Sequence, residues 1–197
     1  PYTTLFRSGI VYGGFAALAQ TDLKKMIAYS SVSHMGFVLL GFSAFNEAGV
    51  RGAVLQMISH GLITSGLFLL AGTLYARAHT REMGAFGGLA RNMPRFAGCL
   101  IFFSMASLGL PGLSGFPGEF LVLLGNHAAF PWATAAACIG ILLSAAYLLT
   151  MIQKILWGPL ADKWKTLPDL GVRETLTLIP LVRSEERRVG KECRSRW

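Results

Sequence analysis

One carboxylate, Glu119, stands where an apolar segment is interrupted, and it is the leading candidate for proton chemistry in this sequence. The stretch LGLPGLSGFPGEF at 108–120 places two prolines and four glycines between two apolar runs. Proline removes a backbone donor and glycine loosens the chain, so the stretch predicts a helix that stops and restarts. In a bilayer, an ionisable residue beside such a break is a functional-site hypothesis. The alternative is a glutamate that caps the restarted helix, and the residues alone leave both open.

Two histidines could relay protons, because imidazole titrates near neutral pH and can accept at one nitrogen while donating at the other. His60 lies between Gln56 and Thr64 at four-residue spacing, which predicts a polar stripe along an otherwise apolar helix. His34 shares a predicted helix face with Ser30. The bland alternative is a histidine that only hydrogen-bonds a neighbouring helix. Because of the polar stripe, a proton-relay role for His60 is weighed equally with this structural alternative. A relay role for His34 is ranked lower.

Lys24 and Lys25 come just before the first full apolar run. Lysines at this place usually orient a membrane protein, and that reading is favoured. The sharper reading is that one of them delivers or modulates a proton, with Asp22 as a pairing partner.

Other kinds of catalytic site find no support in the sequence. Gly87 and Gly88 are not followed by a GK[ST] sequence, and no HExxH or CxxC motif is present. Cys99 and Cys138 lie far apart inside apolar runs, which fits neither metal spacing nor a disulfide framework.

The apolar runs that must position these residues predict an all-α, polytopic transmembrane bundle. About 20 apolar residues are needed to span a bilayer. Residues 27–45, 53–76 and 133–153 meet or approach this length, and 96–125 forms the broken span. The shorter runs 9–20 and 175–182 read as the end of one helix and the start of another.

Charge is segregated among the loops that join these spans. Apolar residues make up 53% of the chain, yet its formal charge is +8. One set of alternate loops holds ten basic residues, whereas the other holds Arg51 alone. This asymmetry follows the positive-inside rule, so the basic side is assigned to the cytoplasm or the mitochondrial matrix. A basic chain could indicate nucleic-acid binding, but clustering between apolar runs favours membrane topology, and no nucleic-acid partner is expected.

The two ends carry an unusual relationship. One coding sequence for PYTTLFRS (1–8) is CCC TAC ACG ACG CTC TTC CGA TCT, and its reverse complement translates to RSEERRVG (183–190). Protein termini have no physical reason to be translations of complementary strands. Residues 1–8 and 183–197 are therefore expected to be translated sequencing adaptor and are excluded from fold reasoning. The alternative is a genuine basic tail at a membrane surface. Removing the seven basic and three acidic residues of these ends from 18 and 10 leaves a core, 9–182, with a charge of +4.

Four motifs bring a family into view: QTDLKKMIAYSSVSHMGF (20–37), MISHGL (57–62), LYARAHTR (74–81) and GEF (118–120). Together they resemble the antiporter-like membrane subunits of proton-pumping NADH:quinone oxidoreductase, respiratory complex I. The M-type subunit, the bacterial counterpart of mitochondrial subunit 4, is the most similar. The first motif is shared with the sister L- and N-type subunits and with multisubunit cation/proton antiporters.

The resemblance implies a fourteen-helix subunit of two inverted five-helix repeats, each with one broken helix. Residues 9–182 would run from the end of helix 9 to the start of helix 14, within the second repeat. By the family's pattern Glu119 is the terminal proton site, and His60 and His34 lie on the hydrophilic axis that connects to it. The family's other glutamate and lysines, on helices 5, 7 and 8, would precede Gly9.

The implied function is proton translocation in the bacterial inner membrane, coupled to quinone reduction elsewhere in the complex. The subunit itself would hold no cofactor, because NADH, FMN, iron–sulfur clusters and quinone belong to other parts. Its partners would be the L-type and N-type subunits and the lipid bilayer. The alternatives are a subunit of a Na⁺/H⁺ antiporter, a subunit of a membrane-bound hydrogenase complex, and a purely structural membrane module.

Overall fold

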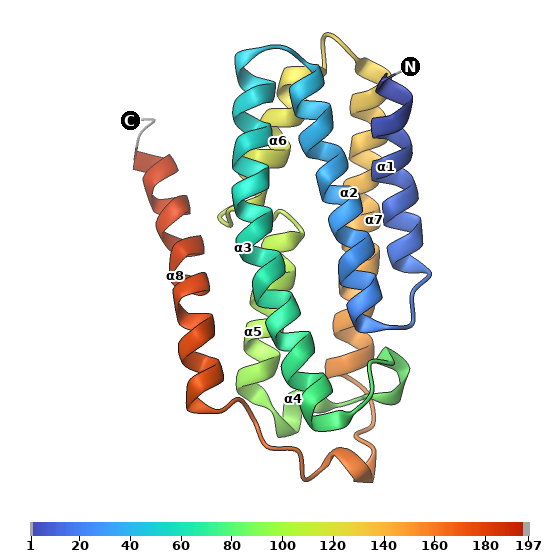
Figure 1. The fold of residues 1–197 in the computed structure, drawn as a ribbon, viewed down its shortest axis with the longest axis vertical. Helices are drawn as coiled ribbons and strands as arrows, with labels where there is room; N and C mark the ends of the chain where they lie inside the picture. Colours follow the sequence, from blue (N-terminus) through green and yellow to red (C-terminus); the bar gives the residue numbers. More distant parts are fainter. Residues whose placement is uncertain (1, 195–197) are drawn as a thin grey trace.

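A computed structural model describes residues 2–194, with side chains described for 9–185, and the named elements in this range are all helices joined by short connections (Figure 1). Its elements are α1 (Tyr2–Leu18), α2 (Leu23–Ser43), α3 (Glu47–Ala78), η1 (Met83–Ala85), α4 (Leu89–Asn92), α5 (Pro94–Ser107), α6 (Gly115–Asn126), α7 (Pro131–Leu156), η2 (Asp162–Trp164) and α8 (Val172–Arg194). The predicted all-α bundle is confirmed.

Three helices within the described range, α2, α3 and α7, are long and apolar enough to cross a membrane. In Figure 1 they stand side by side with α1, and α1 packs against both α2 and α7. Helix α3 has 32 residues, which corresponds to about 48 Å at 1.5 Å per residue, well beyond the ~30 Å hydrocarbon core.

Two predicted boundaries were wrong, because side-chain caps start the helices earlier than hydropathy indicates. The Asp22 carboxylate accepts from the amides of Lys24 and Lys25 at 2.8 and 3.0 Å, so α2 begins at Leu23 and both lysines lie in its first turn. Asn46 Oδ1 accepts from the Gly49 amide at 2.8 Å, so α3 begins at Glu47 and takes in most of the residues between the predicted spans 27–45 and 53–76.

The broken span predicted over 96–125 is confirmed as α5 followed by α6. The two helices are separated by 108–114, where Gly109 and Gly112 adopt positive φ angles of 73° and 98°. These angles are costly for residues with a Cβ, which explains why glycine occupies both positions. Pro117 falls in the first turn of α6, where its missing N–H leaves no helical hydrogen bond unmade.

Helices α3 and α6 approach each other closely through small residues. A Cβ at Gly52 would lie 2.7 Å from Val122 N, and a Cβ at Gly118 would lie 2.7 Å from Gln56 Oε1. Such small-residue contacts are the usual means by which helices associate in lipid, where burial of apolar surface provides little drive. This packing brings the polar stripe of α3 against the helix break.

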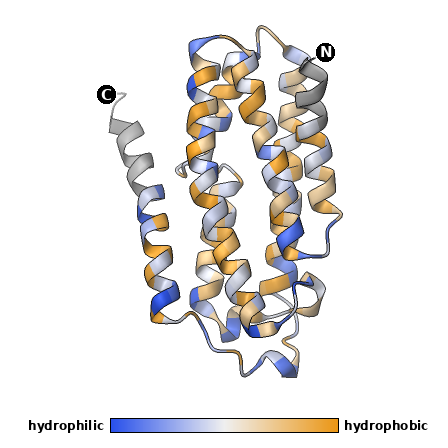
Figure 2. Cartoon of the chain, viewed as in Figure 1, coloured by the Kyte–Doolittle hydropathy of each residue, from blue (hydrophilic) through white to orange (hydrophobic). Residues whose placement is uncertain are grey.

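The ends of the bundle differ in charge, as the loop pattern predicts. The connections 19–22, 79–93 and 157–171 lie at the lower end in Figure 1, whereas 44–46 and 127–130 lie at the upper end. Hydrophilic segments accordingly gather at the lower end in Figure 2, although polar residues also occur at the upper end. Arg51, the single cation expected on the upper side, pairs with Glu47 at 2.5 Å.

The segments expected to be adaptor sequence fall within helices. Residues 2–8 belong to α1, and 183–194 belong to α8, which runs alongside α3 and contains Pro180. Residues 1 and 195–197 lie outside the described residues. Helix α8 thus includes the predicted start of a further span at 175–182.

Candidate functional site

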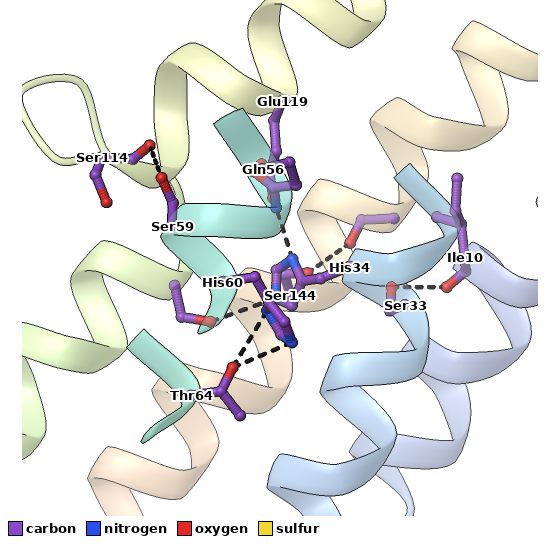
Figure 3. A network of polar contacts seen from close by, with 12 residues as sticks. Ile10, Ser33, His34, Gln56, Ser59, His60, Thr64, Ser114, Glu119 and Ser144 are labelled. Carbon is purple, nitrogen blue, oxygen red and sulfur yellow. Dashed lines mark hydrogen bonds and ion pairs between the residues drawn. The ribbon is translucent and has the colours of Figure 1, made fainter. Parts of the chain in front are cut away.

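Glu119 lies in the second turn of α6, just beyond the helix break, and its side chain is buried. Its Oε1 lies 3.1 Å from His34 Nδ1 on α2 and accepts from Gln56 Nε2 on α3 at 3.2 Å. Its Oε2 faces the break, where a Cβ at Gly109 would lie 2.9 Å away. The carboxyl group is therefore held between three helices and the interrupted backbone (Figure 3).

The His34 ring connects this carboxylate to a second group of hydroxyls. On the far side of the ring, Nε2 lies 3.3 Å from Ser107 Oγ, at the end of α5, and 3.4 Å from the Tyr147 hydroxyl on α7. The Tyr147 hydroxyl donates to Ser144 Oγ at 3.1 Å, and Ser144 donates to the Gly140 carbonyl at 3.0 Å. His34, with 1% of its surface exposed, is thus contacted by side chains from three other helices.

The surroundings of His34 satisfy the ring in two protonation states. An ionised carboxylate only accepts hydrogen bonds, so Nδ1 carries a proton when it faces ionised Glu119. With Nε2 unprotonated, that nitrogen can accept from the Ser107 hydroxyl. With Nε2 protonated, it can donate to the Tyr147 oxygen, whose own proton is given to Ser144. A ring that finds partners in both states is suited to taking up and releasing protons.

His60 extends the cluster away from Glu119 along the α3 stripe. Its ring centroid lies 5.3 Å from that of His34, and Thr64 Oγ1 lies 3.1 Å from its Nε2. The predicted stripe of Gln56, His60 and Thr64 therefore faces the bundle interior, with Gln56 buried and the other two half-buried. Gln56, at one end of the stripe, reaches the carboxylate directly.

A hydrogen bond between Ser59 and Ser114 links α3 to the helix break. Ser59 Oγ donates to the Ser114 carbonyl at 3.0 Å, and the Ser114 hydroxyl donates to Glu185 on α8. Glu185 belongs to the segment expected to be adaptor sequence, so we assign it no role in the site. The Ser59 contact links the last residue of the break to the same face of α3 that carries Gln56.

The structure brings three of the five sequence-predicted residues together. Glu119, His34 and His60 form one cluster, but the expected order of the histidines changes, because His34 rather than His60 contacts the carboxylate. Lys24 and Lys25 are exposed in the first turn of α2, at the lower end of the bundle. Their proposed part in proton delivery stays a prediction.

Sequence reasoning missed Ser107, Ser144 and Tyr147 as members of the cluster. Ser144 and Tyr147 are three residues apart on one face of α7, a spacing that flags a polar stripe but does not say what it faces. Ser107 carried no signal beyond its place before the break. Among the described residues, no group of three or more His, Cys, Asp or Glu side chains could hold a metal ion.

Comparison with known protein families shows which family this chain belongs to. Residues 3–144 match the family described as NADH:quinone oxidoreductase/Mrp antiporter, transmembrane region. The chain belongs to this antiporter-like family. It is a multi-pass protein of the bacterial plasma membrane, and the buried Glu119–His34 pair falls within the matched residues.

Similar proteins support the resemblance to the M-type subunit. NADH-quinone oxidoreductase subunit M of Rhodobacter capsulatus is 50% identical over 174 residues, which is 88% of this chain and 34% of that protein. Respiratory complex I from Thermus thermophilus contains a chain with a TM-score of 0.89 and 39% identity, covering 94% of this chain and 39% of that one. The Mrp complex from Dietzia sp. has a TM-score of 0.77 at 24% identity, covering 81% of this chain and 30% of that one, and shows the fold alone.

The chain therefore spans about a third of the length of the curated relatives it matches. The predicted membership of the antiporter-like subunits, with subunit M as the type, is confirmed. The complex I chain shares the fold of this chain.

Proposed function

We propose that this chain forms the part of an M-type subunit that carries a terminal proton-transfer site of NADH:quinone oxidoreductase. The observation that carries the proposal is the contact between His34 and Glu119, because it joins two titratable groups inside apolar helices at a break in the backbone. Burying such groups is costly, and membrane proteins tolerate them chiefly for ion movement. The 50% identity to a protein named subunit M adds independent support.

In this proposal the proton is shared along a line from His60 through His34 to Glu119. Gln56 Nε2 donates to Glu119 Oε1, and His34 Nδ1 faces the same oxygen, so a proton can pass between the ring and the carboxyl group. The other oxygen, Oε2, faces the break, where freed backbone groups and water can hydrogen-bond. A proton leaving His34 for the carboxylate would then reach the break without crossing intact helix.

A charge on His60 would repel a charge on His34 strongly, because the two rings lie close together. Two unit charges at the 5.3 Å centroid separation repel by roughly 3 kcal/mol at an effective dielectric constant of about 20. Protonation of His60 would therefore drive the proton of His34 toward Glu119. This coupling gives a physical means by which charge changes along the axis control the terminal site.

The reaction as a whole would depend on parts outside this chain. Quinone reduction, with NADH, FMN and iron–sulfur clusters, would take place in other subunits, and this chain would supply only proton transfer. We expect L-type and N-type subunits as its neighbours in the membrane. As part of that complex it would contribute to an enzyme, without holding a redox centre itself.

Two related functions remain as alternatives: a subunit of a Na⁺/H⁺ antiporter and a subunit of a membrane-bound hydrogenase complex. The proton chemistry of the His34–Glu119 pair would serve all three. The identity to proteins named subunit M favours the oxidoreductase over the antiporter, for which the solved Mrp complex shows the fold alone.

For the ends we propose that 1–8 and 183–197 derive from adaptor sequence and that 9–182 is the native stretch. The complementary coding relationship between PYTTLFRS and RSEERRVG supports this. The 174 residues that align with the curated relative equal 9–182 in number, which adds support. Resequencing the gene from genomic DNA across both junctions tests it, and recovery of the same codons would overturn it.

The deciding experiment for the function replaces Glu119 in the full-length subunit within the assembled complex. Glu119→Gln keeps the shape and the hydrogen-bonding capacity but cannot bind and release a proton. We expect fewer protons translocated per NADH oxidised in liposomes, with assembly intact. The matched control is Glu47→Gln, since Glu47 is exposed and paired with Arg51 at the upper end of the bundle, outside the Glu119 cluster. Unchanged stoichiometry in Glu119→Gln would reject the assignment.

A further inference from the structure

A groove at the lower, basic end of the bundle lies outside the proton site. It has a volume of about 280 Å³ and runs between the start of α2 and the last turns of α3. Its lining combines an apolar wall of Phe68, Ala71 and Gly72 with two cations at the mouth, Lys24 and Arg81. Neither the helix packing nor the proton cluster accounts for this combination.

The cations at the mouth are available to a ligand. Among the described residues neither Lys24 nor Arg81 forms an ion pair with a carboxylate. The Arg81 guanidinium lies over the Tyr75 ring, 4.4 Å from its centroid, a contact that holds the group in place while leaving its N–H donors free for an anion. Lys24 and Arg81 thus form a cationic pair from two different elements.

Two carboxylates, Asp22 and Glu82, lie near this pair, but among the described residues neither forms an ion pair with Lys24 or Arg81. The Asp22 carboxylate accepts from the amides of Lys24 and Lys25, and Glu82 is exposed, so solvent screens its charge. The Thr80 hydroxyl accepts from the Glu82 amide at 3.3 Å, so its own proton can still be donated to a ligand oxygen. The mouth therefore offers cations and one hydroxyl donor to an anion.

We propose that this groove binds an anionic phospholipid, with the phosphate between Lys24 and Arg81 and the start of an acyl chain against Phe68, Ala71 and Gly72. The cations lie at the end of two membrane-spanning helices, where lipid headgroups meet protein, and basic pockets on this side of a membrane suit such headgroups. A soluble phosphate would explain the cations but not the apolar wall below them.

The size and shape of the groove fit part of a lipid. Its volume of about 280 Å³ is just below the ~300–1,000 Å³ typical of sites that enclose a whole small molecule, and it suits a headgroup and the first part of one chain. A Cβ at Gly72 would meet no atom within 4 Å, so the floor of the groove is open at that residue. The inference does not depend on the proton-transfer proposal, because no residue of the Glu119 cluster lines the groove.

The test measures lipid retention on the full complex rather than its activity. Complex purified in mild detergent is titrated with phosphatidylglycerol or with phosphatidylcholine, and bound lipids are counted by native mass spectrometry. We expect Lys24→Gln and Arg81→Gln each to weaken phosphatidylglycerol binding about fivefold, since each cation near a membrane surface contributes about 1 kcal/mol toward an anionic lipid. Gly72→Leu should reduce it with all charges retained.

Two matched variants separate the groove from general effects. Lys25→Gln removes the same charge from the same helical turn without touching the groove, and Gly61→Leu adds the same side chain to an open position elsewhere on α3. Both should retain the lipid. The proposal is overturned if all variants bind alike, if phosphatidylcholine binds as well as phosphatidylglycerol, or if inorganic phosphate alone displaces the lipid.

Discussion

His34 Nδ1 lies 3.1 Å from Glu119 Oε1, a contact between residues that are 85 positions apart in the chain. It links α2 to α6 directly beside the helix break, and it is buried. The pair gives the proton site its donor and its acceptor in one hydrogen bond. Each of the following predictions tests one of the contacts that hold this pair, in the full-length subunit within the assembled complex.

Replacing His34 should be more harmful than replacing His60. His34→Ala removes the hydrogen bond to Glu119 and the connection to Ser107 and Tyr147, so we expect proton transfer through the subunit to slow by about 10²-fold, as with Glu119→Gln. His60→Ala should be milder, because water can bridge a polar axis. Proton uptake by proteoliposomes measures both, at matched assembly. A larger loss in His60→Ala would contradict the order.

Removing the Tyr147 hydroxyl should slow proton transfer through His34, because a protonated ring would lose a hydrogen-bond acceptor. Tyr147→Phe deletes the acceptor near Nε2, whereas Ser144 keeps its bond to the Gly140 carbonyl. We expect slower proton transfer, by about tenfold, corresponding to a hydrogen bond to a charged group worth ~1.5 kcal/mol. The same proteoliposome assay measures it, with Tyr29→Phe as the control, since Tyr29 lies exposed on α2. Equal rates in the two variants would remove Tyr147 from the relay.

A methyl group at Gly109 should disturb the carboxylate itself. Gly109→Ala places a Cβ 2.9 Å from Glu119 Oε2, a contact that cannot be accommodated without a shift. Gly112→Ala is the matched control, because it also has a positive φ but its Cβ would meet no atom within 4 Å. Both should lose about 1 kcal/mol of stability to backbone strain. Only Gly109→Ala should also lower protons translocated per NADH, and similar pumping in both would argue against the contact.

The close approach of α3 and α6 should be sensitive to one added carbon. Gly118→Ala places a Cβ 2.7 Å from Gln56 Oε1 and 2.9 Å from the Gln56 backbone nitrogen, so the helices must separate. We expect a loss of about 1–3 kcal/mol, seen as a lower melting temperature of the purified complex. Gly61→Ala, on the open face of α3, should have little effect. Equal melting temperatures would show that this contact is more adaptable than its distances indicate.

The sequence alone determined the main apolar spans, the place of the helix break and the residue types that could move protons. Length, apolar runs and the Pro–Gly break fix the spans and place Glu119 beside the interruption, because these are local consequences of backbone chemistry. The start of α2 already depended on a side-chain cap that hydropathy does not register.

Only the tertiary structure decided which of the candidate groups meet. Whether His34 or His60 touches Glu119 depends on the rotation of α2 and α3 about their axes, and close packing at Gly52 and Gly118 sets how near α3 comes to α6. Ser107 and Tyr147 join the site for the same reason, since each faces His34 from a different helix. Periodicity defines the face of one helix, whereas the neighbour that the face meets is a property of the whole bundle.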